Sequence, residues 1–277
     1  MERDSRGEAD FNMKLLRSEP EGRLLKLSDV ERRLPAITRR RLGLQTIPLA
    51  EVVGTEGRAA TFTRDFEPRH ESSRQRLRSL AAAFPDGDFP PIVAVKLGDV
   101  YFVIDGHHRV ALARRTGGEM IDADVTEFVT RVPLPAGADM LEVVLRQLER
   151  VFLEDSGLAE ARPGIRVSAS RPALYLELLE NLQVHGYHLM REHGRVLSNE
   201  RIAEDWYDHV FSPAVAPAVR ERIAKSLRDA PDADLFLLLH HRRRDAFPSS
   251  GCPFLAETSA ALAEPRRRLR HRIRVGA

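Results

Sequence analysis

The feature that most constrains the fold of this chain is an expected strand that turns abruptly into a helix. Residues 101–104 are apolar, β-branched or aromatic, and the run stops at Asp105-Gly106. A helical pattern occupies residues 110–115, and Gly117-Gly118 ends it. Such a junction leaves the first backbone N–H groups of the helix unpaired, at the end that the peptide dipoles make partly positive. The pattern therefore predicts a site for phosphate or a nucleotide.

Two residues of the junction are the first candidate ligands. Arg109 has a planar guanidinium that suits two phosphate oxygens, and a salt bridge to Asp105 or Asp124 is its structural alternative. Gly106 either allows a positive φ or close approach of a ligand, or it is an ordinary turn glycine. We expect Arg109 to be the main phosphate contact.

The junction also contains two histidines and an aspartate, each with more than one candidate role. His107 and His108 are adjacent, so their rings point in different directions and do not share one metal. We expect one of them to donate to phosphate and the other to pack in the loop. Asp105 has three candidate roles, which are to cap the following helix, to hold magnesium, or to accept a proton from a substrate hydroxyl.

The elements around this loop resemble the core of the ParB/sulfiredoxin superfamily. The resemblance is carried by residues 91–95, a turn at Gly98-Asp99 and the loop 101–109. The flanks agree in order, and the similar region covers residues 44–131; the flanking segments are 47–53, 74–84 and 121–125. Members of the superfamily include chromosome-partitioning CTPases, ATP-using sulfinic-acid reductases and kinases of free serine. The resemblance implies a small α/β nucleotide-binding domain that uses CTP, ATP or ADP with Mg²⁺.

One activity of that superfamily is excluded by the chemistry of the loop. Sulfiredoxins have Gly-Cys-His-Arg here, and their cysteine attacks the activated sulfinate. This chain has His107 in place of that cysteine, and Cys252, its one cysteine, lies far along the sequence. Cysteine redox chemistry requires a thiolate beside the site, so we expect that the protein is not a sulfiredoxin.

A second candidate catalytic carboxylate is suggested by the resemblance. The free-serine kinases place a glutamate soon after the first strand, and Glu56 occupies a similar place, although its Gly-Thr-Glu-Gly surroundings differ from the kinase pattern. The partitioning CTPases carry an arginine-rich box after the glycine turn. Arg109 matches that box, but the next arginines, Arg114-Arg115, come one to two helical turns later. Asp105 and Glu56 are therefore the candidate catalytic residues.

The pattern along the chain predicts an α+β fold in three parts. Residues 1–43 have helical spacing and are expected to form an N-terminal helical arm, with Ser28-Asp29 as the cap of its second helix. Residues 44–131 are expected to form the ParB/sulfiredoxin-like domain, with a mixed sheet. Residues 132–277 are expected to form a helical C-terminal domain with a basic tail. Residues 205–213 resemble a segment of uncharacterised ParB-like bacterial proteins, which implies no activity.

Composition and charge place the chain among ordinary proteins of the cytoplasm. It has 277 residues, 43% of them hydrophobic and 30% charged, and a formal net charge of +2. One cysteine suits a reducing compartment. The first residues are charged and no long apolar run follows, so we expect no signal peptide, no membrane contact and a cytoplasmic location.

Histidines and arginines outside the loop suggest further partners. His185, His188 and His193 lack a completing ligand in a recognisable pattern, so we expect no metal site there. The run Arg39–Arg41 is either a solvated face or an arm that contacts nucleic acid. The strongest basic cluster is near the C-terminus, and its candidate DNA or acidic-protein contacts are Arg266, Arg267, Arg268, Arg270 and Arg272.

Three functions are compatible with these observations. The first is a ParB-like nucleotide-binding regulator that is associated with DNA and forms a homodimer. In this function the helical region docks a partner. The second is a small-molecule phosphotransferase, with Arg109 on the phosphates and Asp105 or Glu56 on the acceptor hydroxyl. The third is an interaction scaffold without catalysis. The lack of a clear second carboxylate favours the regulator.

Overall fold

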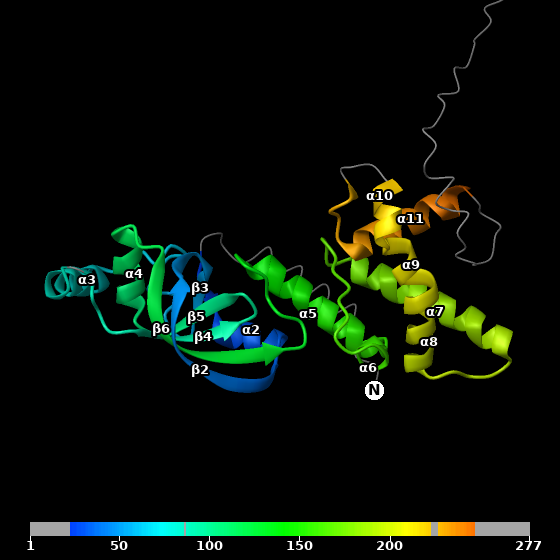
Figure 1. Cartoon of the computed structure of the whole chain (residues 1–277), viewed down its shortest axis with the longest axis horizontal. Helices are drawn as coiled ribbons and strands as arrows, with labels where there is room; N and C mark the ends of the chain where they lie inside the picture. Colours follow the sequence, from blue (N-terminus) through cyan, green and yellow to red (C-terminus); the bar gives the residue numbers. More distant parts are fainter. Residues whose placement is uncertain (1–22, 86, 223–226, 247–277) are drawn as a thin grey trace, which may run out of the picture. The chain divides into compact units, whose positions relative to one another are not determined.

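The computed structural model describes residues 23–85, 87–222 and 227–246 of the chain. Contacts divide the chain into two compact units. The first, which we call the sheet unit, extends to Asp155 and also includes residues 164–173. The second, the helical unit, consists of residues 156–163 and the chain from Leu174 onward. The fold is therefore α+β, with a mixed sheet first and a helical region after it (Figure 1).

The sheet has six strands in the order β1-β3-β5-β4-β6-β2. These are β1 (Leu25–Lys26), β2 (Ala36–Pro48), β3 (Val52–Thr55), β4 (Ile92–Leu97), β5 (Val100–Asp105) and β6 (Met120–Thr130). Strands β1, β3 and β5 are parallel neighbours, β4 forms an antiparallel hairpin with β5, and β2 pairs antiparallel with β6. Because β3 and β5 are parallel, the loops that follow Thr55 and Asp105 start at the same edge of the sheet.

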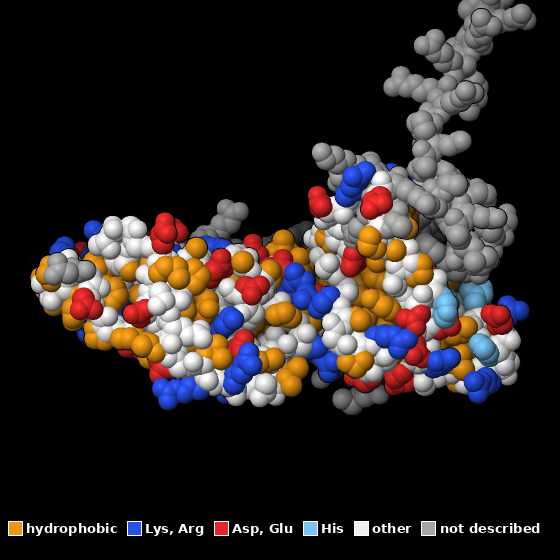
Figure 2. Space-filling view, in the orientation of Figure 1, with side chains coloured by type: hydrophobic (Ala, Val, Ile, Leu, Met, Phe, Trp, Pro, Cys, Tyr) orange, Lys and Arg blue, Asp and Glu red, His pale blue; other side chains and the backbone are white. Residues whose placement is uncertain are grey.

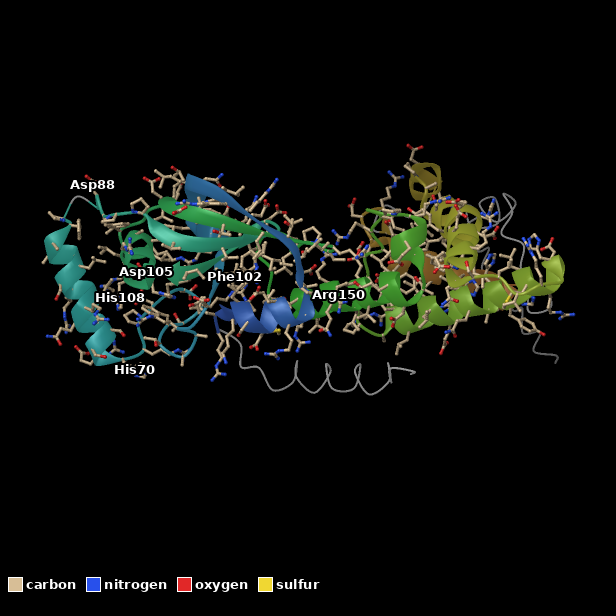
Figure 3. The ribbon with its side chains drawn as sticks, turned by 90° about the horizontal axis from the view of Figure 1, so that it is seen from below. His70, Asp88, Phe102, Asp105, His108 and Arg150 are labelled. Atoms are coloured by element: carbon tan, nitrogen blue, oxygen red, sulfur yellow. The ribbon has the colours of Figure 1, made fainter. Side chains whose placement is uncertain are left out.

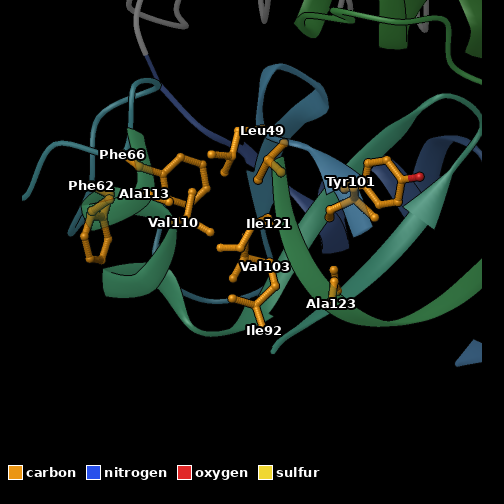
Figure 4. Close-up of a cluster of buried hydrophobic side chains, with 14 of the residues drawn as sticks. Leu49, Phe62, Phe66, Ile92, Tyr101, Val103, Val110, Ala113, Ile121 and Ala123 are labelled. Carbon is orange, nitrogen blue, oxygen red and sulfur yellow. The ribbon is translucent and has the colours of Figure 1, made fainter. Parts of the chain in front are cut away.

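Side chains of the strands alternate between two hydrophobic cores, one on each face of the sheet. On β5, Tyr101 and Val103 belong to the first core, whereas Val100 and Phe102 belong to the second. Figure 4 shows part of the first core, where side chains of the sheet meet those of α4 and of the loop before α3. Because both faces of β5 are buried, its sequence is a nearly continuous apolar run.

Helices cover both faces of this sheet. They are α2 (Leu27–Arg33), α3 (Glu71–Ala83), α4 (His107–Arg115) and α5 (Met140–Asp155), with a 3-10 turn η1 (Leu49–Glu51). Leu77 of α3 and Val110 of α4 belong to the first core, and Val30 of α2 and Val143 of α5 belong to the second. Helices α3 and α4 also contact each other, which places α3 beside the strand-to-helix junction.

A buried carboxylate holds residues 164–173 to the sheet unit. Glu149 of α5 is 0% exposed, and it accepts hydrogen bonds of 2.7–2.9 Å from Arg146, Arg166 and the backbone N–H of Val167. Burial raises the pKa of Glu149, but the hydrogen bonds and charge of Arg166, with the other donors, outweigh it and leave the pKa below its usual value. Glu149 is therefore ionised and fully coordinated inside the unit.

The helical unit is built around Trp206. Its helices are α6 (Leu158–Ala161), α7 (Leu174–His193), α8 (Asn199–Trp206), the π-helix η2 (Tyr207–Phe211), α9 (Ser212–Val215), α10 (Pro217–Arg222) and α11 (Asp232–Ala246). Trp206 is buried, and its ring centroid lies 5.0 Å from that of Phe211 and 5.6 Å from that of Phe236. Its indole Nε1 donates to Asn181 Oδ1 at 2.8 Å. Aromatic packing with one internal hydrogen bond therefore joins α7, α8 and α11.

Many elements predicted from the sequence are confirmed. Strands β4 and β5 form the predicted hairpin around Gly98-Asp99. The N-cap residues of two helices are also confirmed, because Asp139 Oδ1 accepts from the N–H of Glu142 at 2.9 Å and Ser198 Oγ accepts from that of Arg201 at 3.4 Å. Local sequence signals are strongest at such caps and turns.

The predicted helical arm is wrong for residues 36–43, which form the first half of β2. The arginines Arg39–Arg41 lie on this strand and pair, in sequence order, with Glu31, Glu127 and Asp124. Each arginine of the run therefore has an acidic partner, which reduces its net positive charge. The pairing depends on strand register, which brings residues far apart in sequence together.

Two other local predictions differ from the structure. Lys26 precedes α2, and no side chain caps that helix, so Ser28-Asp29 is not its cap. The compact sheet unit continues past the predicted boundary at residue 132, because Ala138 and Val143 pack into its second core. An amphipathic helix such as α5 does not reveal from its sequence which core it joins.

Replacing Glu149 with glutamine is expected to lower the free energy of unfolding by about 3 kcal/mol, because it removes the buried charge that Arg146, Arg166 and the Val167 N–H hold. Urea unfolding at neutral pH would measure this. Glu154→Gln on the same helix is the matched control, since Glu154 is half-exposed and its pair with Arg150 is expected to contribute less than about 1 kcal/mol. Equal effects of the two variants would contradict the prediction.

Candidate functional site

The strand-to-helix junction predicted from the sequence is present between β5 and α4. Gly106 is the N-cap of α4 and has φ 100°, in the left-handed region. A Cβ at Gly106 would lie 2.5 Å from Cγ2 and 2.8 Å from Cβ of Ile92. Glycine is therefore required here by both backbone conformation and packing. Helix α4 begins at His107, earlier than predicted, so the first N–H groups of the helix belong to His107 and His108.

A cleft of about 450 Å³ lies at this junction. Its lining comes from the start of α4, from α3 and from the loop after β3, and consists of Arg58, Arg76, Ser79, Leu80, Ala83, Asp105, Gly106, His107, His108 and Arg109. Figure 3 shows Asp105 and His108 at the end of the sheet unit where α3 lies, with His70 and Asp88 near the two ends of that helix. The cleft is therefore bounded by two helices and one loop.

The cleft is electropositive. Three arginines line it from three different elements, and Asp105 is the only carboxylate in its lining. Arg109 is already paired with Asp105. Arg58 and Arg76 form no ion pair with any residue in the described ranges, so no acid of those ranges compensates their charges. Two uncompensated guanidinium groups beside a helix N-terminus are suited to an anion.

Arg109 is held by the protein itself. Its Nη1 donates to the carbonyl oxygens of Pro90 and Pro91 at 2.7 and 2.6 Å, and its Nη2 donates to Asp105 Oδ2 at 2.6 Å. These bonds use three of the five guanidinium N–H groups. The structure thus contains the salt bridge that the sequence analysis gave as the alternative, and a phosphate contact of Arg109 stays a prediction. Asp105 does not cap α4, because its carboxylate is turned to Arg109 instead.

His107 is a buried, neutral residue. Only 4% of it is exposed, its ring lies 5.7 Å from that of Phe62, and its Nε2 lies 2.6 Å from Thr55 Oγ1. Burial, and next the charge of Arg58, lower the pKa of His107 from 6.5 to about 4. The same Thr55 hydroxyl oxygen accepts from the backbone N–H of Arg58 at 3.2 Å. His107 therefore positions the loop that carries Arg58.

His108 is partly buried between α3 and the cleft. Burial, and next the charge of Arg76, lower the pKa of His108, whereas a hydrogen bond with the backbone of Ser73 raises it. Its Nε2 is buried and has no hydrogen-bond partner among the described residues. A phosphate contact of His108 stays a prediction.

Glu56 is not part of the cleft lining. It is exposed, and its backbone N–H bonds to the carbonyl of Val103 at 3.0 Å, which continues the pairing of β3 with β5. The structure therefore does not bring Glu56 into the cleft with Asp105. The nearby Glu51 has a structural role, because its Oε2 accepts from the N–H of Gly137 at 2.8 Å.

Arg58, Arg76 and Ser79 were not predicted from the sequence as site residues. Arg76, Ser79, Leu80 and Ala83 follow helical spacing on one face of α3, and this pattern was a signal for a shared surface. The pattern does not identify what this face of α3 packs against, because no local pattern predicts the contact between α3 and α4. Arg58 is placed by the parallel pairing of β3 with β5, which is likewise a long-range contact.

Other predicted sites have a simpler outcome. The arginines Arg266, Arg267, Arg268, Arg270 and Arg272 lie outside the described residues. Within the described ranges, no group of three His, Cys, Asp or Glu side chains is arranged to hold a metal ion. Among the helices of the same ranges, none is long and apolar enough to cross a membrane.

Comparisons with known proteins do not assign this chain to a family. No family model matches the chain, and no curated protein matches it. Among solved structures, the chain is similar to sulfiredoxin from Arabidopsis thaliana, with 15% sequence identity over 31% of this chain and 86% of that chain, and a TM-score of 0.23. A likeness at this level supports no statement about function.

The free energy of unfolding is expected to fall as the pH is lowered from 6.5 towards 4. Over this range the unfolded chain protonates His107 and the folded chain does not, so protons favour unfolding. Values of 6.5 and about 4 correspond to roughly 3 kcal/mol when the shift is fully expressed. Urea unfolding between pH 4 and 8 measures the slope.

The control separates His107 from the other histidines. In His107→Asn the slope between pH 4 and 6.5 is expected to become shallower, whereas His193→Asn, at an exposed histidine that has no ion pair in the described ranges, keeps the wild-type slope. An unchanged slope in His107→Asn would count against a neutral buried imidazole.

Proposed function

We propose that the sheet unit binds the phosphates of a nucleotide in the cleft between α3 and α4. The observation that carries this proposal is the pair of arginines, Arg58 and Arg76, that reach one cleft from separate elements and have no acidic partner in the described chain. Guanidinium groups bind phosphate oxygens with short, charge-assisted hydrogen bonds. The first N–H groups of α4, which have no partner within the helix, add donors at the same place.

The lining residues divide into two roles in this proposal. Arg58 and Arg76 contact the phosphates, because their charges are available. Arg109 and Asp105 are positioning residues, because their mutual pair and the bonds from Arg109 to residues 90–91 fix the loop. His107 acts through Thr55, which also holds the backbone of Arg58.

A magnesium ion is compatible with this cleft through Asp105. Magnesium in nucleotide sites is held by one or two carboxylates together with phosphate oxygens and water. Asp105 is the one carboxylate in the lining, and 72% of its side chain is exposed, so one of its oxygens is accessible beside the pair with Arg109. The ion would neutralise phosphate charge when bound.

A regulatory nucleotide-binding function is favoured over phosphoryl transfer. Transfer to a hydroxyl requires a group that orients the acceptor beside the phosphate. Glu56, the candidate for that role, does not line the cleft, and the lining offers no second carboxylate. The function is therefore closer to that of the ParB-like partitioning CTPases, which the sequence resembles, than to that of the free-serine kinases. In this proposal the helical unit docks a partner, and residues 266–272 contact DNA or an acidic protein.

Arg76→Ala is expected to weaken nucleotide binding by about 10- to 100-fold, as loss of a charged hydrogen bond to phosphate does. Arg58→Ala is expected to act similarly. Calorimetric titration of CTP, ATP and ADP, with and without Mg²⁺, measures the change. Arg78→Ala is the matched control, since Arg78 lies on the same helix, pairs with Glu71 and is not in the lining.

Two outcomes would contradict this function. The first is that wild-type protein binds none of the three nucleotides, which would leave an interaction scaffold. The second is that Arg76→Ala and Arg78→Ala bind equally well. Steady release of phosphate or transfer to a hydroxyl acceptor would instead move the assignment to an enzyme.

A further inference from the structure

The helical unit contains a second cavity, of about 510 Å³, that the proposed function does not use. It lies between α7 and α11, with one residue from η2, and Figure 2 shows histidine side chains gathered on this unit beside hydrophobic and acidic ones. Its lining consists of Glu177, Glu180, Asn181, Val184, His185, His188, Val210, Leu237, His240 and His241. The volume is in the range of small-molecule pockets.

The charge of this cavity is opposite to that of the α4 cleft. Its lining has two carboxylates and contains no arginine or lysine. Glu177 lies 3.3 Å from His241, whereas Glu180 forms no ion pair with a residue of the described ranges. Glu177 and Glu180 are three residues apart on α7, so they lie on neighbouring turns of one helix face. This end of the cavity is therefore suited to a cation.

Part of the cavity lining is apolar. Val210 and Leu237 are buried, while Val184 is 57% exposed, although it is a large hydrophobic residue. An exposed valine beside a concave apolar surface is what a ligand with a hydrocarbon or aromatic body would cover. Apolar contact and carboxylate charge are thus adjacent in one cavity.

One imidazole of the lining contacts Asn181. The indole N–H of Trp206 can only donate, so Asn181 Oδ1 accepts from it and the amide group of Asn181 faces His240. The distance from Asn181 Nδ2 to the nearer ring nitrogen of His240 is 3.2 Å. Asn181 therefore connects Trp206 to the cavity lining.

We propose that this cavity binds a small organic cation, with an ammonium group carried on an aliphatic or aromatic body. The ammonium group lies at Glu180 and Glu177, where carboxylates accept its hydrogen bonds. The body covers Val184, Val210 and Leu237. This ligand class follows from the charge and shape of the lining and is independent of nucleotide binding in the sheet unit.

Trp206 is a built-in reporter for this site. It is the only tryptophan of the chain, and it is bonded to Asn181, which lines the cavity. The test titrates the full chain with 2-phenylethylamine and spermidine, using 2-phenylethanol as the uncharged analogue, and follows Trp206 fluorescence and calorimetric heat. We expect saturable binding of at least one amine and at least tenfold weaker binding of 2-phenylethanol.

Two variants locate the binding. Glu180→Gln is expected to weaken amine binding about tenfold, because it removes a charged acceptor without breaking an ion pair. Val184→Lys is expected to abolish it by placing a fixed positive charge at an exposed position of the cavity. Glu192→Gln, on α7 but outside the lining, is the matched control and is expected to bind as the wild type does.

Three results would overturn the proposal. They are an absence of saturable binding by either amine, equal binding of the amine and the alcohol, and equal affinity of Glu180→Gln and Glu192→Gln. Loss of nucleotide binding in Arg76→Ala does not bear on it, because Arg76 lies in the other unit. Failure of either site is therefore distinguishable from failure of the other.

Discussion

The parallel pairing of β3 with β5 is the contact on which the candidate site depends. It starts two loops at one edge of the sheet, one carrying Arg58 and the other carrying Asp105 and Gly106. The hydrogen bond between Thr55 and His107 then ties the end of β3 to the start of α4. Without this pairing Arg58 would not reach the cleft that Arg76 and Arg109 line.

Burial decides the chemistry of the residues at that edge. His107 is inside the first core and neutral, and Arg109 is engaged by backbone carbonyls and Asp105. The loop is therefore built largely by His107 and Arg109, which were candidate ligands in the sequence. The accessible charge comes from Arg58 and Arg76, which stand apart from the motif. A rigid loop with exposed guanidinium groups beside it is a reasonable way to orient phosphate, because positioning residues need not contact the ligand.

The two cavities described above differ in the charge of their linings. The α4 cleft is lined by three arginines and one carboxylate, and the α7 cavity by two carboxylates and no arginine or lysine. The net charge of the whole chain is close to zero and hides this separation. Because each cavity lies within one unit, each can be tested by variants that leave the other unchanged.

Local signals in the sequence were enough to determine the β4–β5 hairpin, the strand-to-helix junction at Gly106 and the helices that begin after Asp139 and Ser198. Each depends on residues adjacent in the chain, through turn conformation or side-chain caps. Only the tertiary structure decided the partners of Arg39–Arg41, the role of Arg109 and the place of Arg76. Strand register, burial and helix packing join residues distant in sequence, and no local pattern carries that information.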